Sequence, residues 1–191
     1  MLFGNPAEFA IEAMLEPDIQ PPSSVWGRMQ VCCGGVSLGD FTEPCCALYP
    51  SYVGFKDMSA ALPALWRPEF DGLTDLELAD KLDLLLYGCR GDKYVEDDRS
   101  VEECKRDWAE YGQHVFLTNW GEQFDSTGKA FVFSKEAASV VILVRVPRTS
   151  VEVRRLETTR EAFGTAALEF VRWFDEMAEW LSGHGIGRKE Q

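Results

Sequence analysis

The chain has 191 residues, of which 46% are hydrophobic and 12% aromatic, and its formal net charge is −13. This length is sufficient for one domain with a substantial core that needs no metal or disulfide for stability. The acidic excess repels phosphate backbones and anionic lipid surfaces, so we expect neither nucleic-acid nor membrane binding. It favours a partner with a basic surface. A strongly acidic surface can also serve solubility alone, which remains the simpler interpretation of the charge.

The best local structural signal lies in residues 25–41, where two runs of strand-forming residues flank Gly34 and Gly35. A Gly-Gly pair supplies the positive φ angles that a two-residue hairpin turn requires. Residues 9–15 alternate between hydrophobic and polar in the same way, which is typical of a half-buried strand. We therefore predict a three-stranded antiparallel meander, with the proline-rich segment 17–24 as the loop between its first two strands.

The same region resembles a known family. The order Phe9-Ala10-Ile11-Glu12, a proline-bearing gap, Trp26-Gly27 and then Gly35-x-x-x-Gly39-Asp40 is similar to the opening of the immunity protein 42 family. This resemblance implies a small immunity protein encoded beside a toxin in a bacterial polymorphic toxin system. It assigns no functional residues, and the cysteines at positions 32, 33, 45 and 46 are not among the matching residues.

The segment after the hairpin carries few helix signals. Residues 42–56 contain two prolines and are predicted as a connector. Asp57 is expected to cap a short helical segment that runs to Trp66 and is interrupted at Pro63.

Two further helices are marked by capping boxes. Thr74 with Glu77 begins a helix that Gly88 ends, and Ser100 with Glu103 begins a second, shorter helix. The buried face of the first is predicted from apolar residues at helical spacing: Leu78, Ala79, Leu82, Leu85 and Leu86.

Acidic residues outnumber basic ones between Gly88 and Asp107. A polar segment of this length is either an exposed insertion or a binding surface. As a binding surface it would offer carboxylates to a basic partner and Tyr94 as an aromatic anchor. The candidate contact residues are Asp92, Tyr94, Glu96, Asp97, Asp98, Glu102 and Glu103. The alternative interpretation is a solvated loop without a binding role.

The second half returns to strand patterns. Residues 113–120 alternate as a strand, and 130–133 form a short apolar run. Residues 138–146 are apolar without interruption at their centre, which predicts a central strand covered on both faces. A further strand is predicted over 151–156. His114 lies in the first of these patterns, and we interpret it as a packing residue between strands rather than as a catalytic base.

The last predicted element is a long amphipathic helix. Thr158 and Glu161 form a capping-box pattern at its start. Its apolar stripe, which Trp173 and Trp180 widen, comprises Phe163, Ala167, Phe170, Phe174, Met177 and Leu181. Because such a stripe must be buried against a sheet, replacing Phe170 with aspartate is expected to unfold the protein.

These elements predict an α+β fold: a largely antiparallel sheet from the two ends of the chain, covered by a central and a long C-terminal helix. Residues 1–182 are predicted as a single domain, and residues 183–191 as a disordered tail.

The cysteines suggest no metal centre. Residues 32–33 and 45–46 are adjacent pairs, whose side chains point to opposite faces of a strand, whereas zinc ligands are spaced two to four residues apart. We interpret them as buried small hydrophobic residues. Residues 1–10 do not resemble a signal peptide, so we expect a cytoplasmic protein with reduced thiols rather than a bridge between Cys89 and Cys104.

Three functions remain for comparison. The leading prediction is a non-enzymatic, cytoplasmic immunity protein that binds and neutralises a toxin domain through an acidic surface, without metal or cofactor. A small enzyme with dispersed carboxylates is the first alternative, because Glu12, Asp40 and Asp125 can converge in three dimensions. The second is an adaptor or chaperone of a secreted effector, which would bind its client in an exposed apolar groove.

Overall fold

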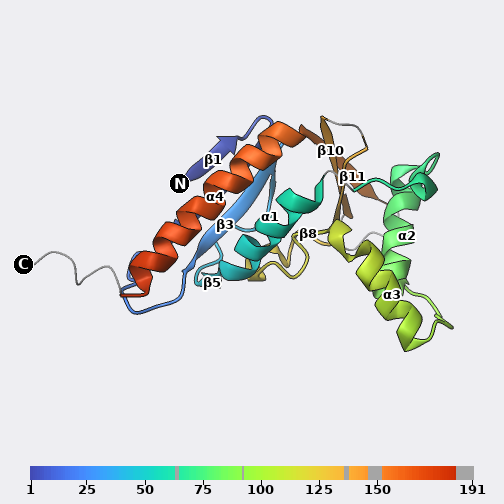
Figure 1. The fold of residues 1–191 in the computed structure, drawn as a ribbon, viewed down its shortest axis with the longest axis horizontal. Helices are drawn as coiled ribbons and strands as arrows, with labels where there is room; N and C mark the ends of the chain where they lie inside the picture. Colours follow the sequence, from blue (N-terminus) through green and yellow to red (C-terminus); the bar gives the residue numbers. More distant parts are fainter. Residues whose placement is uncertain (63–64, 92, 136–137, 146–151, 184–191) are drawn as a thin grey trace, which may run out of the picture.

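The computed structural model describes residues 1–62, 65–91, 93–135, 138–145 and 152–183. Within these residues the chain forms two larger antiparallel sheets, a small two-stranded one and four α-helices (Figure 1). The predicted α+β class is confirmed. The N-terminal and C-terminal strands form separate sheets, whereas the sequence indicated one sheet from both ends.

The first sheet contains the predicted meander and two strands that were not predicted, β1 (Leu2–Asn5) and β5 (Cys46–Ala47). Its members are β1, β2 (Phe9–Leu15), β3 (Trp26–Cys33) and β4 (Val36–Leu38) in that order, with β5 paired to β3. The hairpin turn is confirmed, since Gly34 and Gly35 have φ angles of 57° and 76°. Strand β1 is too short for alternation to reveal it, and it is recruited by pairing with β2.

Helix α1 (Tyr49–Ala61) corrects the prediction of a connector over residues 42–56. Pro50 lies in its first turn, where a missing backbone N–H breaks no helical hydrogen bond, so the proline favours this start rather than opposing a helix. Asp57, predicted as a cap, lies inside α1. Pro63 lies outside the described residues.

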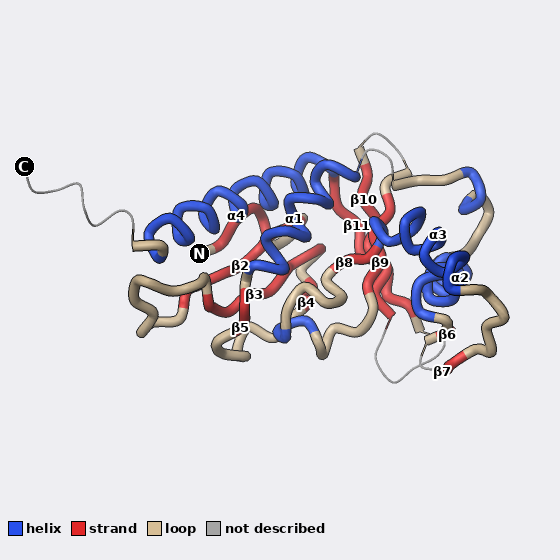
Figure 2. Tube along the Cα trace, turned by 60° about the horizontal axis from the view of Figure 1, so that its bottom comes forward, coloured by secondary structure: helices blue, strands red, loops and turns tan. Residues whose placement is uncertain are grey.

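Helix α4 (Arg160–Leu181) lies across the first sheet with α1 beside it (Figures 1 and 2). Its N-cap is Thr159, whose hydroxyl accepts a hydrogen bond from the Ala162 N–H. Thr158, which was predicted as the N-cap, lies one residue before the actual cap, and its side chain is buried in a strand. Most of the buried stripe is confirmed, and Phe170 has no exposed surface. Trp180, predicted to widen the stripe, is 42% exposed, and Met177 is only partly buried.

The second sheet has the order β11-β10-β9-β8. Its strands are β8 (Val115–Phe116), β9 (Ala130–Phe133), β10 (Ser139–Arg145) and β11 (Val153–Thr159). The prediction of a strand over residues 113–120 is wrong except for β8. Gly112–His114 form a 3₁₀ turn, and Leu117 and Asn119 have φ angles of 59° and 64°, which end the extended conformation. Val146 and Val151 lie outside the described residues.

Strand β10 divides two cores. Val140, Ile142 and Val144 face the large core beneath α1 and α4, whereas Leu143 faces a smaller core. The smaller core lies beneath α2 (Asp75–Tyr87), next to α3 (Val101–Tyr111). The prediction of a central strand covered on both faces is confirmed, and burial on both faces explains why its sequence does not alternate.

The capping boxes predicted for α2 and α3 are present. Thr74 and Glu77 exchange hydrogen bonds at the start of α2, and Ser100 and Glu103 do so at the start of α3. Gly88 ends α2 with a left-handed φ of 63°. Of the predicted tail over residues 183–191, Gly183 is described as a turn residue, and residues 184–191 lie outside the described residues.

Candidate interaction surface

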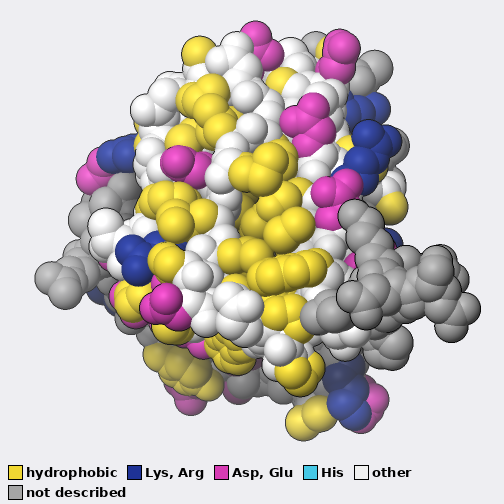
Figure 3. All heavy atoms as spheres, turned by 90° about the vertical axis from the view of Figure 1, so that its left-hand side faces the viewer, with side chains coloured by type: hydrophobic (Ala, Val, Ile, Leu, Met, Phe, Trp, Pro, Cys, Tyr) yellow, Lys and Arg dark blue, Asp and Glu magenta, His cyan; other side chains and the backbone are white. Residues whose placement is uncertain are grey.

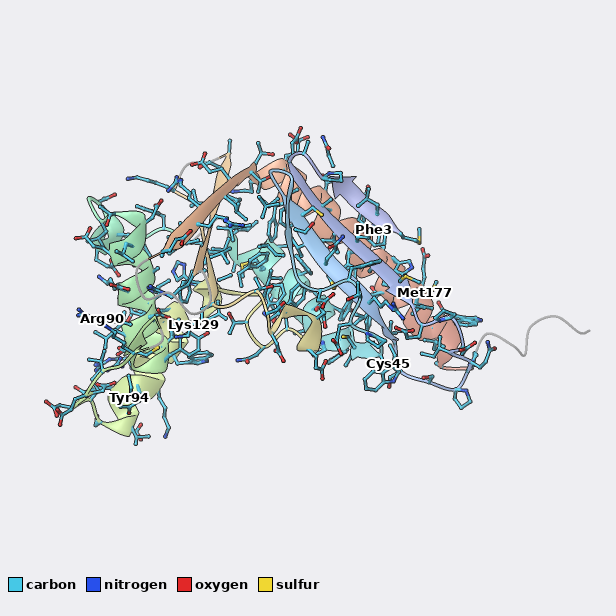
Figure 4. The ribbon with its side chains drawn as sticks, turned by 180° about the vertical axis from the view of Figure 1, so that it is seen from behind. Phe3, Cys45, Arg90, Tyr94, Lys129 and Met177 are labelled. Carbon is cyan, nitrogen blue, oxygen red and sulfur yellow. The ribbon has the colours of Figure 1, made fainter. Side chains whose placement is uncertain are left out.

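We call the acidic segment between Gly88 and Asp107 the acidic loop, and its described residues lie at one end of the molecule. Figure 4 shows Arg90, Tyr94 and Lys129 at this end, with Met177 at the other. Tyr94 is on the small hairpin formed by β6 (Cys89–Arg90) and β7 (Lys93–Tyr94), and it is 83% exposed. An aromatic side chain held this far into solvent by a hairpin makes no core contribution, which leaves it available to a partner.

Arg99 fixes the conformation of the segment between this hairpin and α3. Its guanidinium donates to both carboxylate oxygens of Asp97 and to Asp107, the latter at 2.6 Å. It also donates to the carbonyl oxygens of Leu84 and Leu85 at the end of α2, at 2.6 and 3.0 Å. The hydrogen bonds that Arg99 donates to Asp97 lower the pKa of Asp97 to about 2. The charge of Asp97 is therefore compensated within the molecule.

Two further candidates also have local partners. Glu103 accepts hydrogen bonds from the backbone N–H and hydroxyl of Ser100, and these hold the pKa of Glu103 below its ordinary value. Glu102 lies 3.1 Å from the ammonium group of Lys105, but both side chains are largely exposed. An exposed pair of this kind contributes little to stability and can be exchanged for a partner's cation.

The remaining candidate contact residues have fewer partners within the described part of the protein. Glu96 and Asp98 are exposed, and in the part of the chain that the structure describes neither has an ion-pair partner. Asp92 lies outside the described residues. The structure thus separates carboxylates that shape the loop from those that face solvent freely, a distinction that the sequence does not contain.

A buried ionic cluster anchors the base of the hairpin. Asp83, with no exposed surface, lies 2.8 Å from the Arg145 guanidinium and 3.0 Å from the Lys129 ammonium group. Asp83 also accepts a hydrogen bond of 2.9 Å from the Gly91 N–H. Lys129 lies 2.7 Å from the Cys89 sulfur. These contacts tie α2 and the hairpin to β10 and to Lys129, which directly precedes β9, so the acidic loop projects from a fixed base.

A groove that the sequence analysis missed lies between α1, α3 and the loop after β8. It encloses about 630 Å³. Three aromatic rings line it together with one carboxylate and two exposed amides: Tyr49, Trp108, Trp120, Asp57, Gln113 and Asn119. We call this feature the aromatic groove. Its residues come from three separate segments, so no local pattern could have indicated it.

Two of the three carboxylates of the enzyme alternative have local hydrogen-bond partners. Glu12 accepts a hydrogen bond of 2.7 Å from the side chain of Gln30 on the neighbouring strand. Asp40 accepts from the backbone and hydroxyl of Thr42, which lowers the pKa of Asp40. Asp125 is exposed. The aromatic groove is lined by none of these three carboxylates.

The cysteines are free thiols. The interpretation as buried small residues is confirmed for Cys32, Cys33 and Cys46 and is wrong for Cys45, which is exposed. Burial raises the pKa of Cys33 to about 11, which keeps this thiol protonated. Within the described ranges, no group of three or more His, Cys, Asp or Glu side chains is placed to hold a metal ion.

These features define an α+β protein that exposes an acidic loop and a groove rich in Tyr and Trp, a composition typical of protein-contact surfaces. Among the described residues, no helix is both long and apolar enough to cross a membrane. The chain belongs to the immunity protein 42 family, whose model matches residues 1–173. The match extends the N-terminal resemblance through both sheets and most of α4.

A solved structure has a similar fold. It is the crystal structure of CdiI from Burkholderia dolosa AUO158, which is 14% identical, with a TM-score of 0.60 over 91% of this chain and 99% of that chain. At this identity the likeness shows the fold alone. None of the curated proteins matches this chain.

Proposed function

We propose that this protein is a cytoplasmic immunity protein that neutralises one cognate toxin by binding it, not by chemical transformation. The family match over residues 1–173 carries the proposal. The local hydrogen bonds of Glu12 and Asp40 support binding over catalysis, because those carboxylates are engaged in holding structure.

We further propose that the acidic loop meets a basic surface of the toxin. Glu96, Asp98 and Glu102 supply exposed negative charge, and Tyr94 supplies an aromatic anchor. Asp97 and Glu103 keep the loop in shape, and Asp92 belongs to the same segment. The net charge of −13 adds long-range attraction for a cationic partner, which speeds association.

Reversing the loop's charge tests this contact. A variant with Glu96, Asp98 and Glu102 replaced by lysine should associate with the toxin domain encoded beside its gene at least about tenfold more slowly at low salt. The dependence of its association rate on ionic strength should also be flatter. Surface plasmon resonance with a catalytically inactivated toxin measures both quantities.

The matched control reverses the same number of charges elsewhere. Glu169, Glu176 and Glu179 are exposed on α4, and replacing them with lysine changes the net charge identically. Equal slowing in both variants would mean that only the total charge matters.

Co-expression with the active toxin tests the proposal as a whole: if cells die as readily with the wild-type protein as without it, the protein does not provide immunity.

The adaptor alternative is favoured by one surface feature. Figure 3 shows hydrophobic side chains gathered on the face at the left of Figure 1, where α4 ends. A shallow hollow lined in part by Ile19, Trp26 and Cys45 offers apolar contacts to a client. Binding through such surfaces would be insensitive to salt, so the salt dependence of association distinguishes an adaptor from the proposed immunity protein.

A further inference from the structure

We infer that the aromatic groove receives a lysine or arginine side chain of the toxin, an inference that rests on the proposed function. Two of its rings are open to solvent: Tyr49 is 62% exposed and Trp108 is 47% exposed. Large exposed aromatic side chains of this kind are enriched at the energetic centres of protein interfaces.

The rings that form the groove are held in place. Trp108 packs edge-on against Tyr87, with ring centroids 6.1 Å apart. Trp120 forms the buried side and lies so close to α1 that a Cβ on Gly54 would come within 2.3 Å of its ring. Phe55 packs edge-on against the same ring at 5.1 Å. The aromatic faces are therefore preformed, and the side chains of the groove lose little conformational freedom when a partner binds.

The loop that carries Trp120 is strained and pinned. Leu117 and Asn119 adopt left-handed backbone angles that non-glycine residues rarely occupy. The Ser51 hydroxyl donates to the Trp120 carbonyl oxygen at 2.7 Å and accepts from the Gln123 amide at 3.1 Å, both buried. Strained segments that the surrounding structure holds in this way concentrate at binding sites.

The charge of the groove selects a cation. Asp57 is the one charged residue among those that line it. The neighbouring Lys56 places its ammonium group 3.4 Å from the Tyr52 hydroxyl instead. Asp57 forms no ion pair within the described ranges. Aromatic faces beside an unpaired carboxylate are the combination that binds lysine and arginine side chains, by cation–π attraction and charge pairing.

The groove and the acidic loop fit within one interface. Trp108 lies toward the end of α3, and the acidic loop leads into its start. A helix of 11 residues is about 16 Å long. An ordinary interface buries about 800 Å² on each partner, which corresponds to a patch wider than the length of α3. One basic toxin surface can therefore contact the loop by charge and insert a side chain into the groove.

The test compares groove variants with a matched aromatic control, using the inactivated toxin domain as the probe in calorimetry. Trp108→Ala should weaken binding at least about tenfold, and Asp57→Asn by about threefold to tenfold, because each removes one part of the cation site. Trp180→Ala removes an indole of similar exposure, 42% against 47%, from the far end of α4 and should change the dissociation constant less than about twofold. Trp108→Phe keeps an aromatic face and should recover part of the loss.

A double-mutant cycle identifies the cation. Alanine replacement of the toxin's inserted lysine or arginine should show strong coupling to Asp57→Asn and none to Trp180→Ala. If the wild-type protein binds and both groove variants bind equally well, the inference is overturned and the proposed function stands. If the wild-type protein does not bind the toxin, both fall. A dimer of this chain that Trp108→Ala dissociates would assign the groove to a second copy and would also overturn the inference.

Discussion

His114 shows how a residue's surroundings decide its chemistry. Its ring packs against those of Phe70 and Phe133, with centroids 5.4 and 5.3 Å away. Its Nδ1 lies 2.9 Å from the carbonyl oxygen of Val132, to which the Nδ1–H donates. Burial is the main cause that lowers the pKa of His114 below its ordinary 6.5, and this hydrogen bond partly offsets it. The interpretation as a packing residue is confirmed, although the residue lies in a 3₁₀ turn instead of a strand.

This lowered pKa predicts a pH dependence of stability. Because the folded protein disfavours the imidazolium, the unfolded chain binds more protons, and the free energy of unfolding should fall as the pH drops below about 6.5. His114→Asn keeps a donor for the Val132 carbonyl but cannot titrate. Urea unfolding of both proteins at about pH 7.5 and pH 5.5 should show a smaller loss in the variant. Equal losses would show that other groups cause the dependence.

At the scale of elements, α4 illustrates how one stripe of side chains joins distant parts of the chain. Phe170 contacts Phe3 of β1 and Phe55 of α1, with ring centroids 6.0 and 5.6 Å apart. Gly4 allows this approach, because a Cβ there would lie 2.9 Å from the Cβ of Ala166. The first sheet, α1 and α4 therefore share one layer of aromatic packing.

Substitutions on the two faces of α4 should differ sharply. Phe170→Ala removes a fully buried ring and should lower the free energy of unfolding by about 3–5 kcal/mol. Leu168→Ala, on the same helix at 54% exposure, should change it by less than about 0.5 kcal/mol. Chemical denaturation measures both values. Similar losses in the two variants would contradict the observed burial of this helix.

At the scale of the whole molecule, the second sheet connects the two cores. Alternate residues of β9 face opposite sides: Val132 lies in the large core, and Phe131 and Phe133 lie in the smaller one. If the second sheet unfolded together with one core, the residues that it contributes to the other core would be exposed to solvent. We therefore propose that residues 1–182 form a single domain.

A single domain should unfold in one step. Phe163→Ala in the large core and Phe133→Ala in the smaller one should each shift one common transition to lower urea concentration. The midpoints measured by circular dichroism and by tryptophan fluorescence should coincide in each variant. A variant in which one signal changes at a separate midpoint would show that the two cores unfold independently.

Much of the local structure could be predicted from the sequence. The Gly34-Gly35 turn, the capping boxes at Thr74 and Ser100, and the apolar stripe of α4 are all confirmed. Each depends on interactions between residues within about four positions of one another, and such interactions are present in the sequence itself. The family resemblance in the first forty positions came from the same local hairpin.

The tertiary structure decided the rest. Residues such as Asp97 and Asp98 are equivalent by type, and only the position of Arg99 makes one structural and leaves the other exposed. The separation into two sheets depends on which strands pair across long stretches of chain, and the aromatic groove on packing between three segments. Such contacts depend on where the whole chain places each segment, so no window of sequence contains them.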